Sequence, residues 1–594
     1  MMIEDLMTSF EIISFDVFDT LLMRGCLEPR DVFSLVEEKA QRRGYAKARI
    51  RAEKRANRRV ASGQTRGETS LEEIYSFIPR FGDLKDAELE FEKSCIRANP
   101  EVVELWARAG ELGKRRVIVS DMYLPRPFIE ELLRTNGITG WDGIYVSSEH
   151  RTRKKTGELY RVMMRDQNVD AARILHVGDN PASDVAAANA VGIAAFQYER
   201  IGDRFLRENA FARYYLQEGQ LGARRNLIGA LAAGWQQYRQ RNPSCGYWNK
   251  IGFVYGGVLG YAYACFVARE ARRRGIKRLL LVYRDGYNLE PIFNELFPDL
   301  MTTLIYVPRK VYFYACKDFT DKPHMIAARR RMVWHELEMT GDEQAFLETG
   351  VMSKENEEKF ERASRKARDE YVRYLSTLKI DNPADVALVD MTTSALSAPK
   401  LLESVLGSEI TSFYLLAYKP GLARLPSSVV PMFHAHGTSI IFTLMSEFLF
   451  TAPTPSVVGI ENGVPVYDKA GGFFDEFKAN ICKTIRPAII EGARALSQAG
   501  VEISRGDLLD YFESFHASVT ARDESEFSFA REATGIEQRE GRSPLQRELR
   551  SRRPLLRLLG RVAISVRVWT WLMRRYATFY LLGRIPILRI RLPF

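Results

Sequence analysis

The sequence is organised by short apolar segments that run directly into polar residues. Five of them lie in the first 200 residues, and helical, charge-rich stretches separate them. They are EIISFDVFDTLL (11–22), RRVIVSDMYLP (115–125), WDGIYVSS (141–148), RILHVGDN (173–180) and GIAAFQY (192–198). Alternation of strands with helices predicts a parallel sheet covered by helices on both faces. We therefore predict an α/β domain over residues 1–200.

A second alternation follows a helical connector that we place at 201–245. Its apolar runs are KRLLLVYRDG (277–286), TTLIYVPRK (302–310), DVALVDMTTS (385–394) and ITSFYLLAYKPG (410–421). They predict a second α/β, Rossmann-like domain over 246–470, followed by a polar helical region at 471–540. A chain of 594 residues is too long for one hydrophobic core, which agrees with at least two domains.

One stretch, 251–268, contains 18 residues without a charge, which is the length at which a membrane-spanning helix becomes a candidate. It also contains four glycines, and a strand signal follows soon after it. We interpret it as a buried, close-packed helix of the second domain.

Residues able to carry chemistry stand at the ends of the strands in the first domain. Open α/β sheets build their sites at the carboxyl ends of parallel strands, so we expect these residues to meet. They are Asp16, Thr20, Ser120, Lys154 or Lys155, Asp179 and Asp184.

This set of residue types is suited to phosphoryl transfer. A carboxylate on a strand end, such as Asp16, can attack phosphorus and form an aspartyl-phosphate. A hydroxyl and an ammonium can contact the phosphoryl oxygens, and Mg²⁺ favours a site with a few carboxylates plus the substrate phosphate. We expect Asp16, Asp179 and Asp184 to supply those carboxylates.

The same residues resemble the four motifs of the haloacid dehalogenase (HAD) superfamily, whose members are mostly Mg²⁺-dependent phosphatases. Its D-x-D-x-T pattern is similar to 16–20, and the resemblance implies Asp16 as the nucleophile, with Thr20 and Ser120 holding the phosphoryl group. Its third-motif lysine lies six residues before an aromatic, which implies Lys154 because Tyr160 stands at that offset. GDNPASD resembles the fourth motif and implies Asp179 and Asp184 as metal ligands.

One position departs from the superfamily pattern. Phosphatases of the superfamily carry an acid/base Asp two residues after the nucleophile, and here that residue is Phe18. Asp19 follows it, and on a strand its side chain would point to the opposite face. A phosphatase with a good leaving group, a slow phosphatase, a phosphotransferase and a phosphate-binding module all remain open.

The insert at about 25–112 occupies the position of the superfamily's helical cap, which closes over the site and excludes water. Its segment 46–59 has seven basic residues and one acid. We expect either Arg51 or Arg55 to face the substrate phosphate, or the segment to be a solvated helix face.

Residues 10–470 resemble a family of two-domain predicted HAD-type hydrolases associated with bacterial surface-polysaccharide synthesis. The resemblance implies a sugar phosphate or a lipid-linked sugar phosphate as substrate, and glycosyltransferases as partners. In the second domain, strand ends carry Arg284, Asp285, Arg309, Lys310, Asp390, Thr392, Thr393 and Ser394, a set that suits a phosphate or a nucleotide-sugar. His434 and His436 alternate as on one face of a strand.

The net charge of +11 is concentrated at the end of the chain. Residues 541–594 contain thirteen Arg and one Glu, and six arginines share one side of a helical wheel across 553–575. Arg on one side with Trp, Leu and Tyr on the other predicts a basic amphipathic helix on an anionic membrane surface. We do not expect nucleic-acid binding.

Scattered cysteines without a CxxC pair favour a reducing compartment, so we expect a cytoplasmic protein that is peripheral on the inner face of the plasma membrane.

Overall fold

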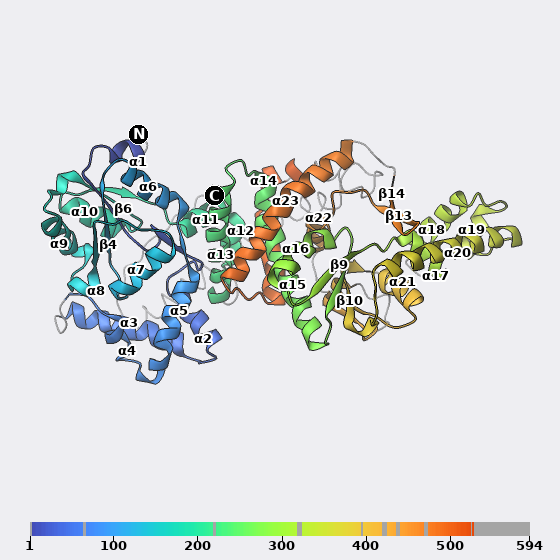
Figure 1. Ribbon diagram of the computed structural model, residues 1–594, viewed down its shortest axis with the longest axis horizontal. Helices are drawn as coiled ribbons and strands as arrows, with labels where there is room; N and C mark the ends of the chain where they lie inside the picture. Colours follow the sequence, from blue (N-terminus) through green and yellow to red (C-terminus); the bar gives the residue numbers. More distant parts are fainter. Residues whose placement is uncertain are drawn as a thin grey trace, which may run out of the picture.

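The computed structural model describes residues 3–62, 67–217, 221–317, 323–393, 396–417, 425–434, 440–468, 473–523 and 525–527. Figure 1 shows an elongated molecule in which two α/β lobes lie on either side of a layer of helices. Both lobes contain a parallel five-stranded sheet, as the alternation of apolar segments predicts. The predicted basic tail at 541–594 lies outside the described residues.

The first sheet has the strand order β5-β4-β1-β6-β7, and every neighbouring pair is parallel. Its central strand β1 (Ile12–Phe15) is buried at every residue because helices cover both faces. The other strands are β4 (Arg115–Ser120), β5 (Gly143–Val146), β6 (Ile174–Gly178) and β7 (Ala194–Gln197).

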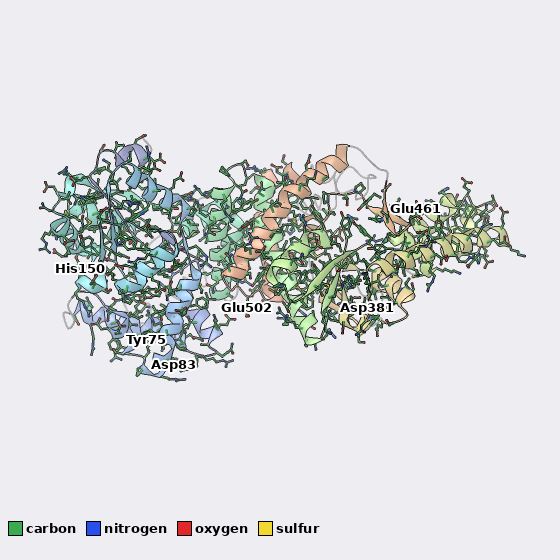
Figure 2. The ribbon with its side chains drawn as sticks, viewed as in Figure 1. Tyr75, Asp83, His150, Asp381, Glu461 and Glu502 are labelled. Atoms are coloured by element: carbon green, nitrogen blue, oxygen red, sulfur yellow. The ribbon has the colours of Figure 1, made fainter. Side chains whose placement is uncertain are left out.

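A helical cap is inserted between β1 and β4 and lies below the sheet in Figure 1. An antiparallel pair, β2 (Leu22–Arg24) with β3 (Ile96–Ala98), joins it to the body. Figure 2 labels Tyr75, the last residue of one cap helix. The cap helices are α2 (Asp31–Lys39), α3 (Tyr45–Ala61), α4 (Leu71–Tyr75) and α5 (Lys85–Cys95).

The insert is shorter than the predicted range of 25–112. Helix α6 (Pro100–Glu111) falls within that range but packs on the sheet instead of the cap. Its ring of Trp106 lies 5.3 Å from that of Phe15 on β1, in an edge-to-face arrangement. The helical periodicity of 25–112 is the same on both sides of β3, so the sequence pattern alone does not separate the two parts.

The second sheet has the order β12-β11-β10-β8-β9, again parallel throughout. Four of its strands coincide with the predicted apolar runs, and the fifth, β12, ends at His434, where the alternation of His434 and His436 indicated a strand. The strands are β8 (Arg278–Val282), β9 (Met301–Ile305), β10 (Val386–Thr393), β11 (Thr411–Ala417) and β12 (Val429–His434).

The layer between the lobes combines helices from two distant parts of the chain. Helix α13 (Leu221–Arg241) contacts α23 (Phe473–Gln498), and α12 (Ala210–Tyr215) contacts α24 (Arg505–Ser518). One continuous apolar core runs from the cap through this layer to the second sheet. The predicted connector and the predicted helical region after 470 are therefore parts of one structural layer.

The apolar stretch at 251–268 lies in this layer. The helical segment Tyr247–Arg273 is long and apolar enough to cross a membrane, but 94% of its most apolar window is buried inside the protein. Its glycines allow α23 to approach closely: a Cβ on Gly492 would lie 2.3 Å from the carbonyl oxygen of Phe253. The segment is a core helix, as the glycine content predicts, and it comprises α14 (Tyr247–Ile251), a π-helical turn (Gly252–Gly256) and α15 (Gly257–Arg273).

A helical arm extends from the second lobe at the right of Figure 1. It has its own small apolar core, which includes Trp334 and Phe346. Its helices are α18 (Pro323–Glu336), α19 (Glu343–Thr349) and α20 (Lys354–Thr377).

Candidate metal and phosphoryl-transfer site

The candidate residues of the first domain meet at the carboxyl ends of three neighbouring strands. Asp16 directly follows the central strand β1, Ser120 is the last residue of β4, and Asp179 directly follows β6. Because β4, β1 and β6 are adjacent and parallel, their ends present these side chains at one edge of the sheet.

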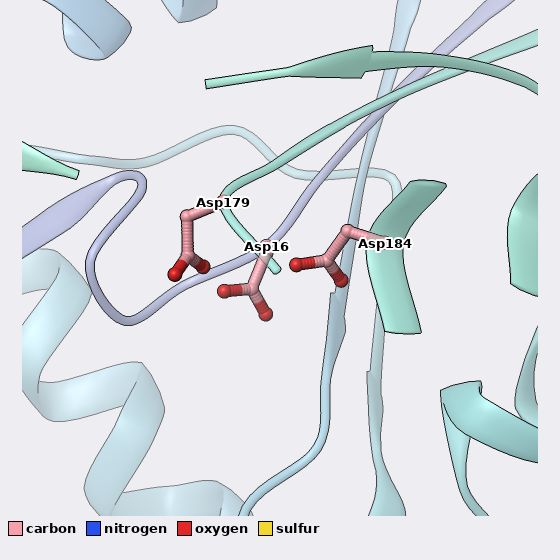
Figure 3. Close-up of side chains that lie close together, drawn as sticks. All are labelled: Asp16, Asp179 and Asp184. Carbon is pink, nitrogen blue, oxygen red and sulfur yellow. The ribbon is translucent and has the colours of Figure 1, made fainter. Parts of the chain in front are cut away.

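Three carboxyl groups converge at this edge. Figure 3 shows Asp16, Asp179 and Asp184 pointing toward one another, and their ligand oxygens all lie within 4.8 Å of each other. Asp184 reaches the group from a helical turn (Pro181–Ala186), where its second oxygen accepts a hydrogen bond from the amide of Asn180 at 2.9 Å. Gly178 is required there, since a Cβ on it would lie 2.5 Å from the Asp184 carboxyl carbon.

Lys154 lies between two of these carboxylates. Its Nζ donates to Oδ1 of Asp16 at 2.6 Å and to Oδ1 of Asp184 at 2.5 Å, and the side chain is 2% exposed. The backbone amide of Lys154 donates to Asp121 at 2.7 Å, which fixes the short 3₁₀ turn (Lys154–Thr156) that carries it. The structure thus places Lys154, and not Lys155, against the nucleophile candidate.

The electrostatics of the site show an excess of negative charge. Burial raises the pKa of Asp16 well above its usual value, and burial together with Asp19 and Asp184 raises the pKa of Asp179 to about 7. Burial alone would also raise the pKa of Asp184, but the Lys154 ammonium and the His176 hydrogen bond hold it below its usual range. The Lys154 ammonium contacts Asp16 and Asp184, and the Arg200 guanidinium lies 3.9 Å from Oδ2 of Asp179.

This donor set fits a divalent cation. Hard cations such as Mg²⁺ take carboxylate oxygens as ligands, and a second positive charge would compensate the carboxylates that Lys154 leaves unbalanced. Asp16, Asp179 and Asp184 therefore form a candidate metal site.

A buried polar chain supports the third carboxylate. His176 on β6 lies 3.3 Å from Oδ1 of Asp184 through Nε2 and 2.7 Å from the hydroxyl of Ser14 through Nδ1. Burial lowers the pKa of His176, so the ring is neutral and acts as a hydrogen-bonding support. Neither residue was predicted from the sequence, although Ser14 and His176 are register partners on β1 and β6 and therefore share one face of the sheet.

The two predicted hydroxyl residues have different positions. Ser120 lines the cleft above the carboxylates. Thr20 is fully buried and is not among the lining residues; its hydroxyl donates to Oδ1 of Asp179 at 3.5 Å. Thr20 thus contacts Asp179, a candidate metal ligand. It does not line the cleft in which a substrate phosphate would bind.

A cleft of about 440 Å³ lies between the strand ends and the cap. Three arginines line it, namely Arg24, Arg30 and Arg200, together with the aromatic rings of Phe33 and Tyr123. Neither Arg51 nor Arg55 lines the cleft; both are exposed, in agreement with the alternative of a solvated helix face, and the Arg55 guanidinium lies 4.7 Å from the ring centroid of Phe77. Arg200 could have been expected, since it comes soon after β7, whose carboxyl end lies at the same edge.

The position of Asp19 also corrects the sequence prediction. Asp19 is not on a strand; its φ of 60° is left-handed, and this turn directs its carboxylate into the cleft instead of the opposite face. There its Oδ2 accepts a hydrogen bond from Arg24 at 3.3 Å and lies 3.8 Å from Arg200. Phe18 lines the same cleft, with the Arg24 guanidinium 4.4 Å from its ring centroid.

Of the candidates in the second domain, Asp285 and Asp390 are brought together, at the end of β8 and in β10. His434 ends β12 as an exposed residue, while His436 and Ser394 lie outside the described residues. Among the described residues, no metal-ligand cluster other than Asp16, Asp179 and Asp184 is found.

Comparison with known proteins assigns the class of the first domain. The sequence pattern of the haloacid dehalogenase-like hydrolases matches residues 10–192. This part of the chain is therefore a HAD-like hydrolase domain, in agreement with the resemblance of its four motifs. No curated protein matches the chain.

Solved structures with similar chains include an L-2-haloacid dehalogenase at 17% identity, covering 32% of this chain and 85% of that one, with a TM-score of 0.26. A HAD phosphatase from Thermococcus onnurineus is 15% identical over 32% and 86% of the two chains, with a TM-score of 0.25. A HAD-hydrolase from Bacillus subtilis, solved with bound magnesium, is 15% identical over 31% and 85%, with a TM-score of 0.24. These scores are too low to support a conclusion about function.

Proposed function

We propose that the first domain is a Mg²⁺-dependent phosphatase or phosphotransferase. The observation that carries this proposal is the convergence of three carboxylates within 4.8 Å around the ammonium of Lys154, at the opening of a cleft lined by arginines. The cleft lining contains seven carboxylates and four basic side chains, a balance that favours a phosphate bound together with a divalent cation.

In the first step, Oδ of Asp16 attacks the phosphorus, and the bond between phosphorus and the leaving oxygen breaks, so that this oxygen departs with the electron pair. Lys154 and Ser120 are placed to contact the phosphoryl oxygens. A divalent cation held by Asp16, Asp179 and Asp184 would reduce the repulsion between the attacking carboxylate and the phosphate. In the second step, water or an acceptor hydroxyl attacks the same phosphorus and releases Asp16.

Phe18 limits which substrates can react quickly. Its side chain neither donates a proton to the leaving oxygen nor activates water. We infer that the favoured substrates have a leaving oxygen that is stable as an anion, such as the terminal phosphate of a diphosphate.

For the substrate class we propose a sugar phosphate or lipid-linked sugar phosphate of surface-polysaccharide synthesis, with the protein in the cytoplasm, peripheral on the inner face of the plasma membrane, and glycosyltransferases as partners. The motif resemblance over residues 10–470 and the basic composition of 541–594 support this assignment. The arginines of the cleft are compatible with a substrate that carries more than one anionic group.

The proposal is tested by a phosphatase screen with Mg²⁺ across sugar phosphates and diphosphates, comparing the wild type with Asp16→Asn. We expect turnover of at least one substrate by the wild type and its loss in the variant. Equal and negligible rates in both proteins across the panel would contradict the catalytic proposal.

The second candidate function is a catalytically weak or inactive module that binds glycan precursors or glycosyltransferases. The specific observation in its favour is Phe18, which occupies the acid/base position and is covered by Arg24. Binding of a panel member without turnover in the same screen, detected calorimetrically, would favour this function.

A further inference from the structure

The chain reverses direction at the centre of the second sheet. After β8 it adds β9 on one side of that strand, then crosses to add β10 on the other side and continues outward through β11 and β12. In open parallel sheets, the crevice at such a reversal, outside the carboxyl ends of the strands, is where ligands bind. Here the reversal falls between β8 and β10.

Strand β10 extends past the end of β8 at this point. Val386–Val389 pair with β8, whereas Asp390, Thr392 and Thr393 pair only with β11. The described residues of β8 thus leave that side of β10 unpaired from Asp390 onward, and we call this unpaired stretch the opening. Asp285 follows β8 in the first turn after it, and its carboxyl group lies close enough to that of Asp390 for the two to raise or lower each other's pKa. Burial, and then the neighbouring carboxylate, raise the pKa of Asp285, while burial raises the pKa of Asp390 to about 6.

Two arginines act on this carboxyl pair from separate loops. Arg284 precedes Asp285, and Arg309 follows β9 at the start of α17 (Arg309–Cys316); both lower the pKa of Asp390. Within the described part of the chain, neither guanidinium forms an ion pair within 4.0 Å, and both side chains are exposed. They are thus available to an anion.

Polar groups on the inner side of the opening are also available. Tyr414 on β11 is the register partner of Asp390, so both side chains lie on the same face of the sheet. Tyr414 is 0% exposed; its hydroxyl lies near that of Thr393 but meets the geometric criteria for a hydrogen bond with none of the described residues. A buried hydroxyl without a partner is costly unless something else satisfies it. Nearby, Thr392 donates to Glu447 on α22 (Ile440–Leu449) at 3.4 Å.

We propose that the opening between β8 and β10 is a second binding site, for a phosphate ester that carries free hydroxyl groups, such as a sugar phosphate. Arg284 and Arg309 bind the phosphate oxygens, since guanidinium groups match phosphate geometry. The carboxylates of Asp285 and Asp390 accept hydrogen bonds from the hydroxyl groups of the organic part. The Tyr414 hydroxyl donates a hydrogen bond to one of these groups or accepts one from it. This site lies in the second lobe and is independent of the carboxylate triad of the first.

Isothermal titration calorimetry on the full chain in EDTA tests the proposal, with inorganic phosphate, a hexose 1-phosphate and a uridine diphosphate hexose as probes. We expect at least one ester to bind, and to bind more tightly than inorganic phosphate. Arg309→Gln should weaken that binding about tenfold or more, because a hydrogen bond to a charged group is lost. Lys277→Gln is the matched control, since Lys277 precedes β8 at the opposite edge of the sheet and is paired with Asp385 at 3.1 Å.

Asp179→Asn separates the two sites. Unchanged binding in Asp179→Asn assigns the ligand to the second lobe. Loss of binding in Asp179→Asn overturns the proposal and leaves the proposed function of the first domain untouched. Equal affinity for inorganic phosphate and both esters, or an unchanged affinity in Arg309→Gln, would also overturn it. Asp390→Asn serves as a second variant, and circular dichroism establishes that each variant is folded. Whichever of the two esters binds more tightly shows whether the ligand class is a sugar monophosphate or a nucleotide sugar.

Discussion

The ring of Phe18 lines the cleft beside the carboxylate triad, with the guanidinium of Arg24 packed 4.4 Å from its centroid. An aspartate at this position would have a neighbouring cation and access to the substrate, so the surroundings are already suited to an acid/base residue. The missing function is thus a property of one side chain and not of the cleft around it.

Phe18→Asp should therefore raise the rate of hydrolysis of unactivated phosphate esters, since a positioned acid–base group contributes ~10²–10⁴-fold. The measurement is kcat/KM for an alkyl phosphate with Mg²⁺. Phe18→Asn, which has similar shape but no ionisable group, is the control and should gain little. If a folded Phe18→Asp protein gains nothing, Phe18 is not the limiting residue.

Metal binding makes a separate prediction at the same scale. Mg²⁺ that binds the folded triad should stabilise the protein, by about 2.7 kcal/mol at a concentration one hundred times its Kd. Differential scanning fluorimetry should show a higher melting temperature with Mg²⁺ for the wild type and for Asp203→Asn, whose carboxylate lies outside the triad. Asp179→Asn should lose the shift. An equal shift in all three proteins would mean that the cation binds elsewhere.

At the scale of single elements, the cap is held by a buried ion pair between two of its helices. Arg49 on α3 and Glu88 on α5 are both 0% exposed, and Nε of Arg49 donates to Glu88 at 2.8 Å. The hydroxyls of Tyr45 and Tyr75 donate to the same carboxylate at 2.6 and 2.8 Å. The Arg49 guanidinium also lies 4.8 Å from the ring centroid of Tyr123, which lines the cleft, so this pair connects the cap to the body.

Arg49→Met should destabilise the protein by about 3–5 kcal/mol, because it leaves the Glu88 carboxylate buried without its cation. Urea unfolding followed by circular dichroism measures the change. Glu53→Ala removes only the partly exposed partner of Arg49 and should cost less than about 1 kcal/mol. The double variant Arg49→Met/Glu88→Gln should recover part of the loss; a double variant less stable than Arg49→Met would contradict this explanation.

The contact between α23 and α15 depends on glycine. A Cβ on Gly257 would lie 2.7 Å from Cα of Gly492, and a Cβ on Gly492 would meet backbone atoms that do not move independently. Gly492→Ala should thus destabilise the helical layer by about 1–3 kcal/mol through overpacking. Gly82→Ala, where no atom lies within 4 Å of the added Cβ, is the control. If the two variants unfold at the same temperature, the close approach of α23 and α15 does not contribute to the stability of the protein.

These elements also show which features the sequence can predict. Most strands of both sheets are visible as apolar runs because they are buried on both faces, and Asp16 and Asp179 are visible because each directly follows such a run. Asp19 was misplaced because a left-handed turn, and not strand alternation, decides its direction. Arg49 was not distinguished from Arg51 and Arg55, because a run of basic residues does not reveal which one meets a buried carboxylate.

At the scale of the whole molecule, the two lobes share one continuous apolar core through the helical layer. The basic segment at 541–594 lies outside the described residues, so its role is argued from composition alone. Each basic side chain near an anionic leaflet contributes on the order of 1 kcal/mol, and Trp and Leu would add a share that does not depend on salt.

Truncation before Arg553 should therefore release the protein from anionic vesicles, while the Mg²⁺-dependent thermal shift of the first domain is retained. Co-sedimentation with anionic and neutral vesicles across a salt series measures the release. Should the full-length and truncated proteins pellet equally, the segment has another role and the membrane assignment is wrong.

The helical layer also constrains how the protein is made. Helix α23 packs on α13, α14 and α15, yet about 200 residues of chain separate the end of α15 from its start. At ~5–20 residues per second, a ribosome needs roughly 10–40 s to synthesise that stretch. During this interval the apolar side of α15 that α23 will cover is exposed on the nascent chain, although the first α/β domain is already complete. The helical layer therefore cannot be completed until the chain on both sides of the second sheet has been synthesised.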